Sequence, residues 1–227
     1  MVSQAEILEL FGTQFRRFLY ENFQSFYQID EAVTQTGFVR KFLGETSLET
    51  GIQESSYAKI TYNSAWFNPW FGELQFKLQL SSIADIFAFV GLKSTTALPT
   101  YNMTESHIGF IFYNGAVYAT SADEYTQQRT YLGPAVSGLN PSNNIIYKIS
   151  KNTFQTYPLP VRYAYFDKMT TDQLQSMLKR KWSSATVHGA NPPEDQDHYF
   201  VAYIKNSTGE DKRLLIKHIL YAEEYPD

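Results

Sequence analysis

The sequence predicts a mainly β protein, built as an antiparallel sandwich or barrel. About ten short segments alternate apolar and polar residues, or carry the β-branched and aromatic residues that favour strands. Strand segments do not alternate regularly with helical ones, which argues against a parallel α/β sheet. Asn114-Gly115 lies between two apolar runs and is the strongest short-range hairpin signal in the chain.

Residues 3–20 are predicted to form an N-terminal helix. A capping-box pattern begins at Ser3, and apolar residues follow at helical spacing: Ile7, Leu8, Phe11, Phe15, Phe18 and Leu19. A helix this apolar has to pack on its own domain, on a neighbouring subunit or on an assembly partner. Its phenylalanines, Phe11, Phe15 and Phe18, are therefore the candidate assembly residues.

From about residue 36 the period of the pattern changes to two. The predicted strands in this part are 38–43, 47–52, 57–62, 72–80 and 84–92. In segment 72–80 apolar and polar residues alternate most cleanly, which predicts one buried and one solvated face. Segment 84–92 is apolar on both sides, as expected of an inner strand.

The turn at Asn114-Gly115 fixes the register of a hairpin over residues 106–120. A two-residue turn places Tyr113 opposite Ala116, Phe112 opposite Val117, Ile111 opposite Tyr118, and Phe110 opposite Ala119. One face then carries Ile108, Phe110, Phe112, Val117 and Ala119, and the other carries Ile111, Tyr113, Tyr118 and Thr120. Neither face is conventionally polar. The tyrosine-bearing face should therefore lie against another part of the chain, a partner or a ligand.

The C-terminal half adds further strands and one short helix. Strands are predicted at 144–150 and 161–166, an amphipathic helix at 170–182, and a closing hairpin of 198–206 with 213–225. We expect one domain over 36–227 with extended loops or an insertion at 123–198. The N-terminal helical and aromatic segment, 1–35, would pack on this domain or extend from it.

Three stretches of the chain resemble a known family. Residues 56–92, 106–120 and 197–225 are similar in order and texture to the concanavalin A-like lectin/glucanase jelly roll. The resemblance covers about residues 36–225 and implies a jelly-roll β-sandwich. Such jelly rolls recur in phage and viral virion proteins as adhesion or decoration modules, and also in polysaccharide-degrading enzymes.

The sequence shows no catalytic pattern of this family. Its retaining glucanases present carboxylates alternating along one strand, which places nucleophile and acid on one face. Here Glu73 is alone on its predicted strand, and the adjacent pairs Asp123-Glu124 and Glu223-Glu224 would point apart on a strand. Of the strand patterns of alginate-lyase-like members, only YFVAYIKN (199–206) is similar, and the arginine-bearing and histidine-bearing strands are missing. We therefore assign no catalytic residues and expect a non-enzyme.

Composition excludes several other classes of function. The formal net charge of −4 argues against nucleic-acid binding, and the absence of cysteine excludes disulfides and thiolate metal sites. The loop HGANPPEDQDH (188–198) offers histidines and acids, but its spacing matches no metal-loop signature, so we assign no metal or cofactor. No secretion signal is visible, and no apolar stretch is long enough for a membrane span.

Two places in the sequence could contact a ligand. In SAWFNPWFGE (64–73), two tryptophans bracket a turn at Asn68-Pro69, so an indole could stack on a sugar. Alternatively, both tryptophans plug the end of the sandwich core. The second place is the polar loop directly after the Tyr118 strand, which carries Asp123, Glu124, Tyr125, Gln127 and Arg129. Alternatively, and preferred here, this is simply a solvated loop. The tyrosine-bearing hairpin face beside it could also meet a ligand. The candidate ligand-binding residues are Trp66, Asn68, Trp70, Tyr113, Tyr118 and Tyr125.

These observations together predict a non-catalytic virion structural or adhesion module. It would assemble with itself or with other virion proteins, with glycan binding as an additional activity, at a virion or extracellular surface. The alternative is a cellular carbohydrate-binding or polysaccharide-degrading protein of the lectin/glucanase fold.

Overall fold

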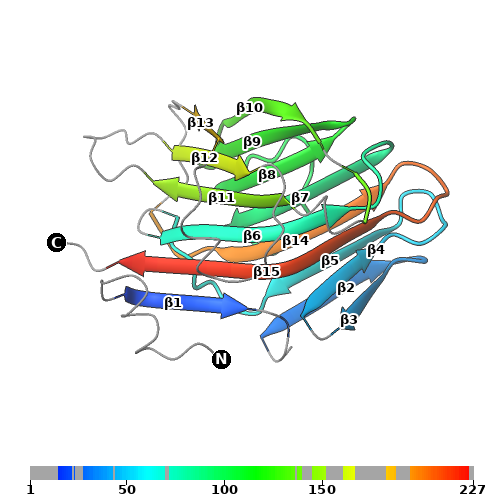
Figure 1. The fold of residues 1–227 in the computed structure, drawn as a ribbon, viewed down its shortest axis with the longest axis horizontal. Helices are drawn as coiled ribbons and strands as arrows, with labels where there is room; N and C mark the ends of the chain where they lie inside the picture. The colour runs from blue at the N-terminus through cyan, green and yellow to red at the C-terminus, as the bar shows by residue number, and fades with distance from the viewer. Residues whose placement is uncertain are drawn as a thin grey trace.

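The computed structural model describes residues 15–21, 23, 28–42, 44–69, 72–135, 137–139, 145–151, 161–166, 183–187 and 195–224. Over these residues the chain forms two antiparallel β-sheets that pack as a sandwich, as the sequence predicts (Figure 1). No helix occurs in this described part of the chain.

Sheet A has eight strands within the described residues. Seven of them follow the spatial order β13 (Ser183–Val187), β12 (Val161–Phe166), β11 (Ile145–Lys151), β6 (Gly72–Leu80), β15 (Arg213–Glu224), β4 (Glu45–Glu49) and β3 (Phe38–Phe42). The eighth strand, β1 (Phe15–Glu21), also pairs with β15. Because β15 is twelve residues long, β4 pairs with its beginning and β1 with its end.

Sheet B has seven strands within the described residues. Their order is β10 (Gln127–Pro134), β9 (Ala116–Ala122), β8 (His107–Tyr113), β7 (Ile86–Lys93), β14 (Tyr199–Asn206), β5 (Tyr57–Tyr62) and β2 (Ile29–Thr34). The central strand β7 is buried along its whole length, which confirms the inner strand expected from its two apolar faces.

The hairpin of β8 and β9 has the predicted register. Tyr113 pairs with Ala116 and Ile111 with Tyr118. Asn114 and Gly115 have φ angles of 47° and 76°, the two positive values that a type I′ turn requires. The local turn chemistry therefore sets the alignment of these two strands.

The predicted N-terminal helix is wrong where the structure describes it. Residues 15–21 form strand β1, and residues 3–14 lie outside the described residues. The backbone of β1 pairs with β15, so a long-range ladder outweighs the local helical spacing. Strand β2, which we also placed in the N-terminal segment, pairs with β5 in sheet B. The predicted helix at 170–182 lies outside the described residues.

The predicted closing hairpin is also wrong. Strand β14 lies in sheet B between β7 and β5, whereas β15 lies in sheet A beside β6. The connection between them, 207–212, therefore passes from one sheet to the other. Strand β14 carries apolar side chains on both faces. Such a strand fits the centre of a sheet that is covered on both faces, which is its position in sheet B.

The polar face of β6 is buried, although the sequence predicts it to be solvated. Gln75, Lys77 and Gln79 are 1%, 1% and 2% exposed. β6 lies between β15 and β11, and β15 places Leu220 and His218 opposite Gln75 and Lys77. Burial, together with the charge of Lys217, lowers the pKa of Lys77 to about 8.

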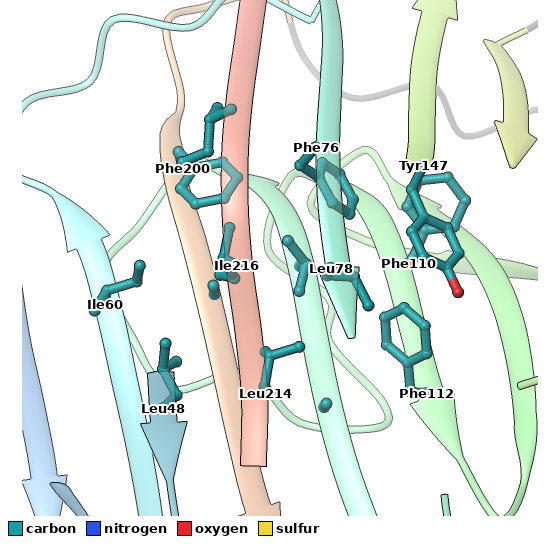
Figure 2. Packing of buried hydrophobic residues seen from close by; sticks show 14 of the residues in the cluster. Leu48, Ile60, Phe76, Leu78, Phe110, Phe112, Tyr147, Phe200, Leu214 and Ile216 are labelled. Carbon is teal, nitrogen blue, oxygen red and sulfur yellow. The ribbon is translucent and has the colours of Figure 1, made fainter. Parts of the chain in front are cut away.

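Aromatic side chains from both sheets form the centre of the core (Figure 2). The Phe76 ring of β6 stacks on Tyr147 of β11, with ring centroids 5.7 Å apart. From sheet B, Phe110 approaches Phe76 edge-on at 5.6 Å, and Phe200 lies 6.4 Å from it. Phe76 is fully buried and contacts both sheets, so it holds the two layers together.

We expect Phe76→Ala to lower the free energy of unfolding by about 3–5 kcal/mol, because it leaves a cavity between the sheets. Phe76→Leu should cost less. Phe42→Ala is the matched control, since Phe42 lies in strand β3 and is 46% exposed. Urea denaturation measures all three variants. A Phe76→Ala variant no less stable than Phe42→Ala would contradict this assignment of the core.

Candidate functional site

The outer face of sheet B carries a second apolar layer. Inner side chains of its strands join the main core, while outward side chains form a separate buried cluster: Phe87, Phe89, Met103, Ile111, Val201 and Tyr203. Met103 belongs to no strand and comes from the β7–β8 connection. The tyrosine-bearing face of the hairpin is therefore covered, at least in part, by the chain itself.

Residues 94–106, the covering loop, lie over this outer face and are fastened at several points. The Lys59 ammonium of β5 donates to the carbonyl of Thr96 at 2.5 Å. Met103 is 1% exposed and packs in the outer cluster. At the other side of the sheet, Arg129 of β10 donates to the covering loop at Tyr101 and Asn102. The loop thus reaches from β5 to β10.

A buried chain of hydrogen bonds supports the end of the covering loop. The Nδ1 atom of His107 donates to the carbonyl of Glu105 at 2.7 Å, because a carbonyl can only accept. Its Nε2 atom then accepts from the Thr120 hydroxyl at 2.9 Å. Gln127 donates in turn to the same hydroxyl oxygen at 2.9 Å. Nε2 takes this accepting role because the imidazole is neutral near pH 7, since burial lowers the pKa of His107 to about 4.

A second buried histidine ties the covering loop to the chain before β14. His198 donates from Nδ1 to the carbonyl of Gln196 at 2.7 Å, and Ser106 lies 2.9 Å from its Nε2 atom. Burial lowers the pKa of His198 as well. The His198 backbone also bridges to Phe67. Three loops therefore meet at this end of sheet B.

Four tyrosines form a connected surface over β8, β9, β10 and the covering loop. We call Tyr101, Tyr113, Tyr118 and Tyr131 the tyrosine surface. Tyr101 lies with its ring centroid 4.6 Å from that of Tyr113 and 6.4 Å from that of Tyr118. Tyr118 in turn lies 5.8 Å from Tyr131. The first three rings are half-buried, and Tyr131 is 59% exposed.

Arg129 fixes the position of Tyr101. Its guanidinium carbon lies over the Tyr101 ring, 3.8 Å from the centroid. One terminal nitrogen, Nη1, donates to the Tyr101 carbonyl at 3.0 Å and to Asn102 Oδ1 at 3.1 Å. The tyrosine surface is therefore held by strand pairing on one side and by Arg129 on the other.

The structure brings together some of the predicted ligand-binding residues and not others. Tyr113 and Tyr118 lie in the tyrosine surface. Tyr125 lies apart from these ring contacts, in the turn between β9 and β10, and is 83% exposed. Sequence reasoning missed Tyr101 and Tyr131. For Tyr131 a signal existed, because the alternation of residues 127–131 places every second side chain on one face.

The turn at 64–69 packs against the core. The Trp66 ring contacts Phe67 edge-on at 5.4 Å and Tyr221 at 5.5 Å, so this half-buried tryptophan packs against core residues. Asn68 is 9% exposed, and its backbone NH and carbonyl both bond to the Tyr221 hydroxyl. Trp70 lies outside the described residues.

The predicted assembly residues are Phe11, Phe15 and Phe18. Phe11 lies outside the described residues, and Phe15 and Phe18 are described only in the backbone of β1. Within the described ranges, no group of three or more His, Cys, Asp or Glu side chains could hold a metal ion. The described part of the chain likewise contains no helix that is long and apolar enough to cross a membrane.

The neutral, buried state of His107 predicts a loss of stability in acid. In the unfolded chain histidine binds a proton near pH 6.5, whereas folded His107 does so only near pH 4. The unfolded state therefore holds more protons between these values, and stability falls as the pH drops through this window. For His107 we expect a loss of about 2 kcal/mol between about pH 7 and about pH 4.5.

Urea denaturation at both pH values measures this loss. His107→Gln should be less stable at neutral pH but should show a pH dependence smaller by about that amount. Gln127→Ala is the matched control, because it removes a hydrogen bond from the same chain without removing a titrating group. An unchanged pH dependence in His107→Gln would show that His107 is not the group responsible.

No protein-family model and no curated protein matches this sequence. Solved structures do share its fold. A protein of unknown function from Shewanella oneidensis MR-1 is 12% identical with a TM-score of 0.62, over 99% of this chain and 95% of that chain. The exoplasmic/lumenal domain of VIP36, in its Ca²⁺/Man3GlcNAc-bound form, is 10% identical with a TM-score of 0.61, over 92% and 89%.

A legume lectin-like domain from Entamoeba histolytica is 12% identical with a TM-score of 0.54, over 87% of this chain and 91% of that chain. At these identities the likeness concerns the fold alone. The concanavalin A-like architecture expected from the sequence is thereby supported, whereas the viral setting receives no support. The chain has the fold of a legume-lectin-like β-sandwich.

Proposed function

We propose that this chain is a non-catalytic carbohydrate-binding module, and that the tyrosine surface with Arg129 is its saccharide contact. The observation that carries the proposal is a chain of four connected tyrosine rings that ends in the 59% exposed ring of Tyr131. The rings lie on the outer face of a lectin-like sheet, where a flat ligand can approach them.

The chemistry of this surface suits a sugar. An aromatic ring stacks on the C–H face of a pyranose, and phenol hydroxyls exchange hydrogen bonds with those of the sugar. Arg129 and Asn102 add polar groups beside the rings. The rings are already ordered by one another and by the covering loop, so binding costs little side-chain entropy.

The fold comparison supports this class of ligand. The VIP36 domain was solved with Man3GlcNAc bound, and the Entamoeba histolytica domain is lectin-like. The likeness of both domains to this chain concerns the β-sandwich fold. They therefore support a saccharide as the class of ligand, and the position of the binding site is argued from the tyrosine surface of this chain.

Two of the described carboxylates, Glu73 and Asp123, support the non-catalytic part of the proposal. Glu73 bonds to Gln75 and forms an ion pair with Lys148. The Asp123 carboxylate accepts two backbone N–H bonds within its own turn. These two carboxylates therefore stabilise a strand and a turn.

The proposal also covers the location and the partners of the protein. An extracellular or lumenal location is supported by the exoplasmic/lumenal origin of the VIP36 domain. A role in a virion, with self-assembly or other virion proteins as partners, rests on the resemblance of the sequence alone.

We expect Tyr131→Ala to lower glycan affinity about tenfold without changing the free energy of unfolding by more than about 0.5 kcal/mol. Binding is measured on an array of neutral and acidic polysaccharides and then by calorimetry with the oligosaccharide that binds best. Phe42→Ala is the matched control, since it removes an exposed ring from strand β3 of sheet A.

Two results would overturn the proposal. If no glycan binds, the carbohydrate-binding function is wrong. If Trp66→Ala abolishes binding while Tyr131→Ala leaves it unchanged, the saccharide contact lies at the 64–69 turn and not at the tyrosine surface.

A further inference from the structure

We propose that the saccharide bound by the tyrosine surface is acidic, and that Arg129 binds its carboxylate. This inference rests on the proposed function and goes further by naming the class of sugar, a uronate.

Arg129 differs from the other arginines whose side chains the structure describes. Each of those pairs with a carboxylate: Arg17 with Asp197 at 2.7 Å, Arg40 with Glu49 at 3.1 Å, and Arg213 with Asp211 at 2.9 Å. Arg129 forms no ion pair with any described residue, although the chain carries a net charge of −4. An exposed cation without an internal partner, on an acidic protein, is available to an external anion.

The orientation of Arg129 leaves a specific part of its guanidinium open. Both Nη1 hydrogens are used by the covering loop, on the Tyr101 carbonyl and Asn102 Oδ1. The Nε–H and Nη2–H groups have no acceptor among the described residues. These two groups form the side-on fork that matches the two oxygens of a carboxylate.

The side chain is ordered before a ligand arrives. The guanidinium lies 3.8 Å from the centroid of the Tyr101 ring, and its two hydrogen bonds fix its rotation. A flexible surface lysine would lose more side-chain entropy on binding the same anion. The fork is therefore preorganised.

Arg129 and the exposed ring lie on one face of the same strand. Residues 129 and 131 are two apart in β10, so their side chains lie on the same face of the strand. Arg129 contacts the Tyr101 ring, and Tyr131 contacts the Tyr118 ring. A uronate presents an apolar C–H face together with a carboxylate at the edge of its ring. A sugar that stacks on Tyr131 can thus place its carboxylate at Arg129.

Neighbouring acids do not occupy the position of the ligand. Across the hairpin, Arg129 faces Thr120, which is neutral. The nearest acids along the chain are Asp123 and Glu124 in the β9–β10 turn. The Asp123 carboxylate accepts the backbone N–H groups of Tyr125 and Thr126.

The test compares acidic sugars with neutral counterparts that differ only at the carboxyl group. The probes are oligomers of galacturonate, of alginate uronates and of glucuronate-containing hyaluronan, each beside its methyl ester, measured by calorimetry. We expect at least one acidic oligomer to bind, and its ester to bind at least tenfold more weakly. Arg129→Gln should abolish this preference, whereas Arg129→Lys should keep part of it because lysine lacks the fork.

The matched control is Arg40→Gln, which removes a paired arginine from strand β3 of sheet A and should leave the preference intact. Equal affinity for acid and ester, or a preference that survives in Arg129→Gln, would overturn this inference while the proposed function stands. Equal binding of dextran sulfate would also overturn it, because the site would then recognise negative charge in general. No binding of any acidic or neutral sugar would overturn the proposed function itself.

Discussion

The central strands of sheet B carry apolar side chains on both faces, and this constraint decides most of the structure. One face packs on sheet A through Phe76, Phe110 and Phe200. The other face needs a second cover, because exposed aromatic and aliphatic side chains would remain in water. The covering loop, 94–106, supplies that cover by inserting Met103 among the outward side chains. Where the cover stops, the tyrosines remain half-exposed.

Covering a sheet with an irregular loop buries polar groups, and these groups must be satisfied. His107 meets this requirement by staying neutral, since it donates to the carbonyl of Glu105 and accepts from Thr120. Lys59 and Arg129 fasten the loop from opposite sides of the sheet. The same contacts that place the loop also order Tyr101 against Tyr113, so a structural requirement of sheet B produces a preorganised aromatic surface.

Local signals explain what the sequence could predict, and long-range pairing explains what it could not. The hairpin at Asn114-Gly115 and the core-facing side of β6 depend on neighbouring residues, and both predictions are confirmed. Strand β1 has helical spacing, but β15, some 200 residues away in the chain, decides its conformation. Of the four residues of the tyrosine surface, Tyr113 and Tyr118 follow from the alternation of the hairpin. Tyr101 joins them only because the covering loop folds back over the sheet. The open fork of Arg129 depends on that loop and could not be seen in the sequence.

The most direct test of this account is hydrogen–deuterium exchange, measured with and without the acidic oligosaccharide that binds best. Binding at the tyrosine surface should slow the exchange of backbone amides at residues 101–102 and 127–131, and should leave residues 64–69 unchanged. Protection confined to 64–69, with no change in β10 or in the covering loop, would contradict the account and would place the ligand at the end of the sandwich.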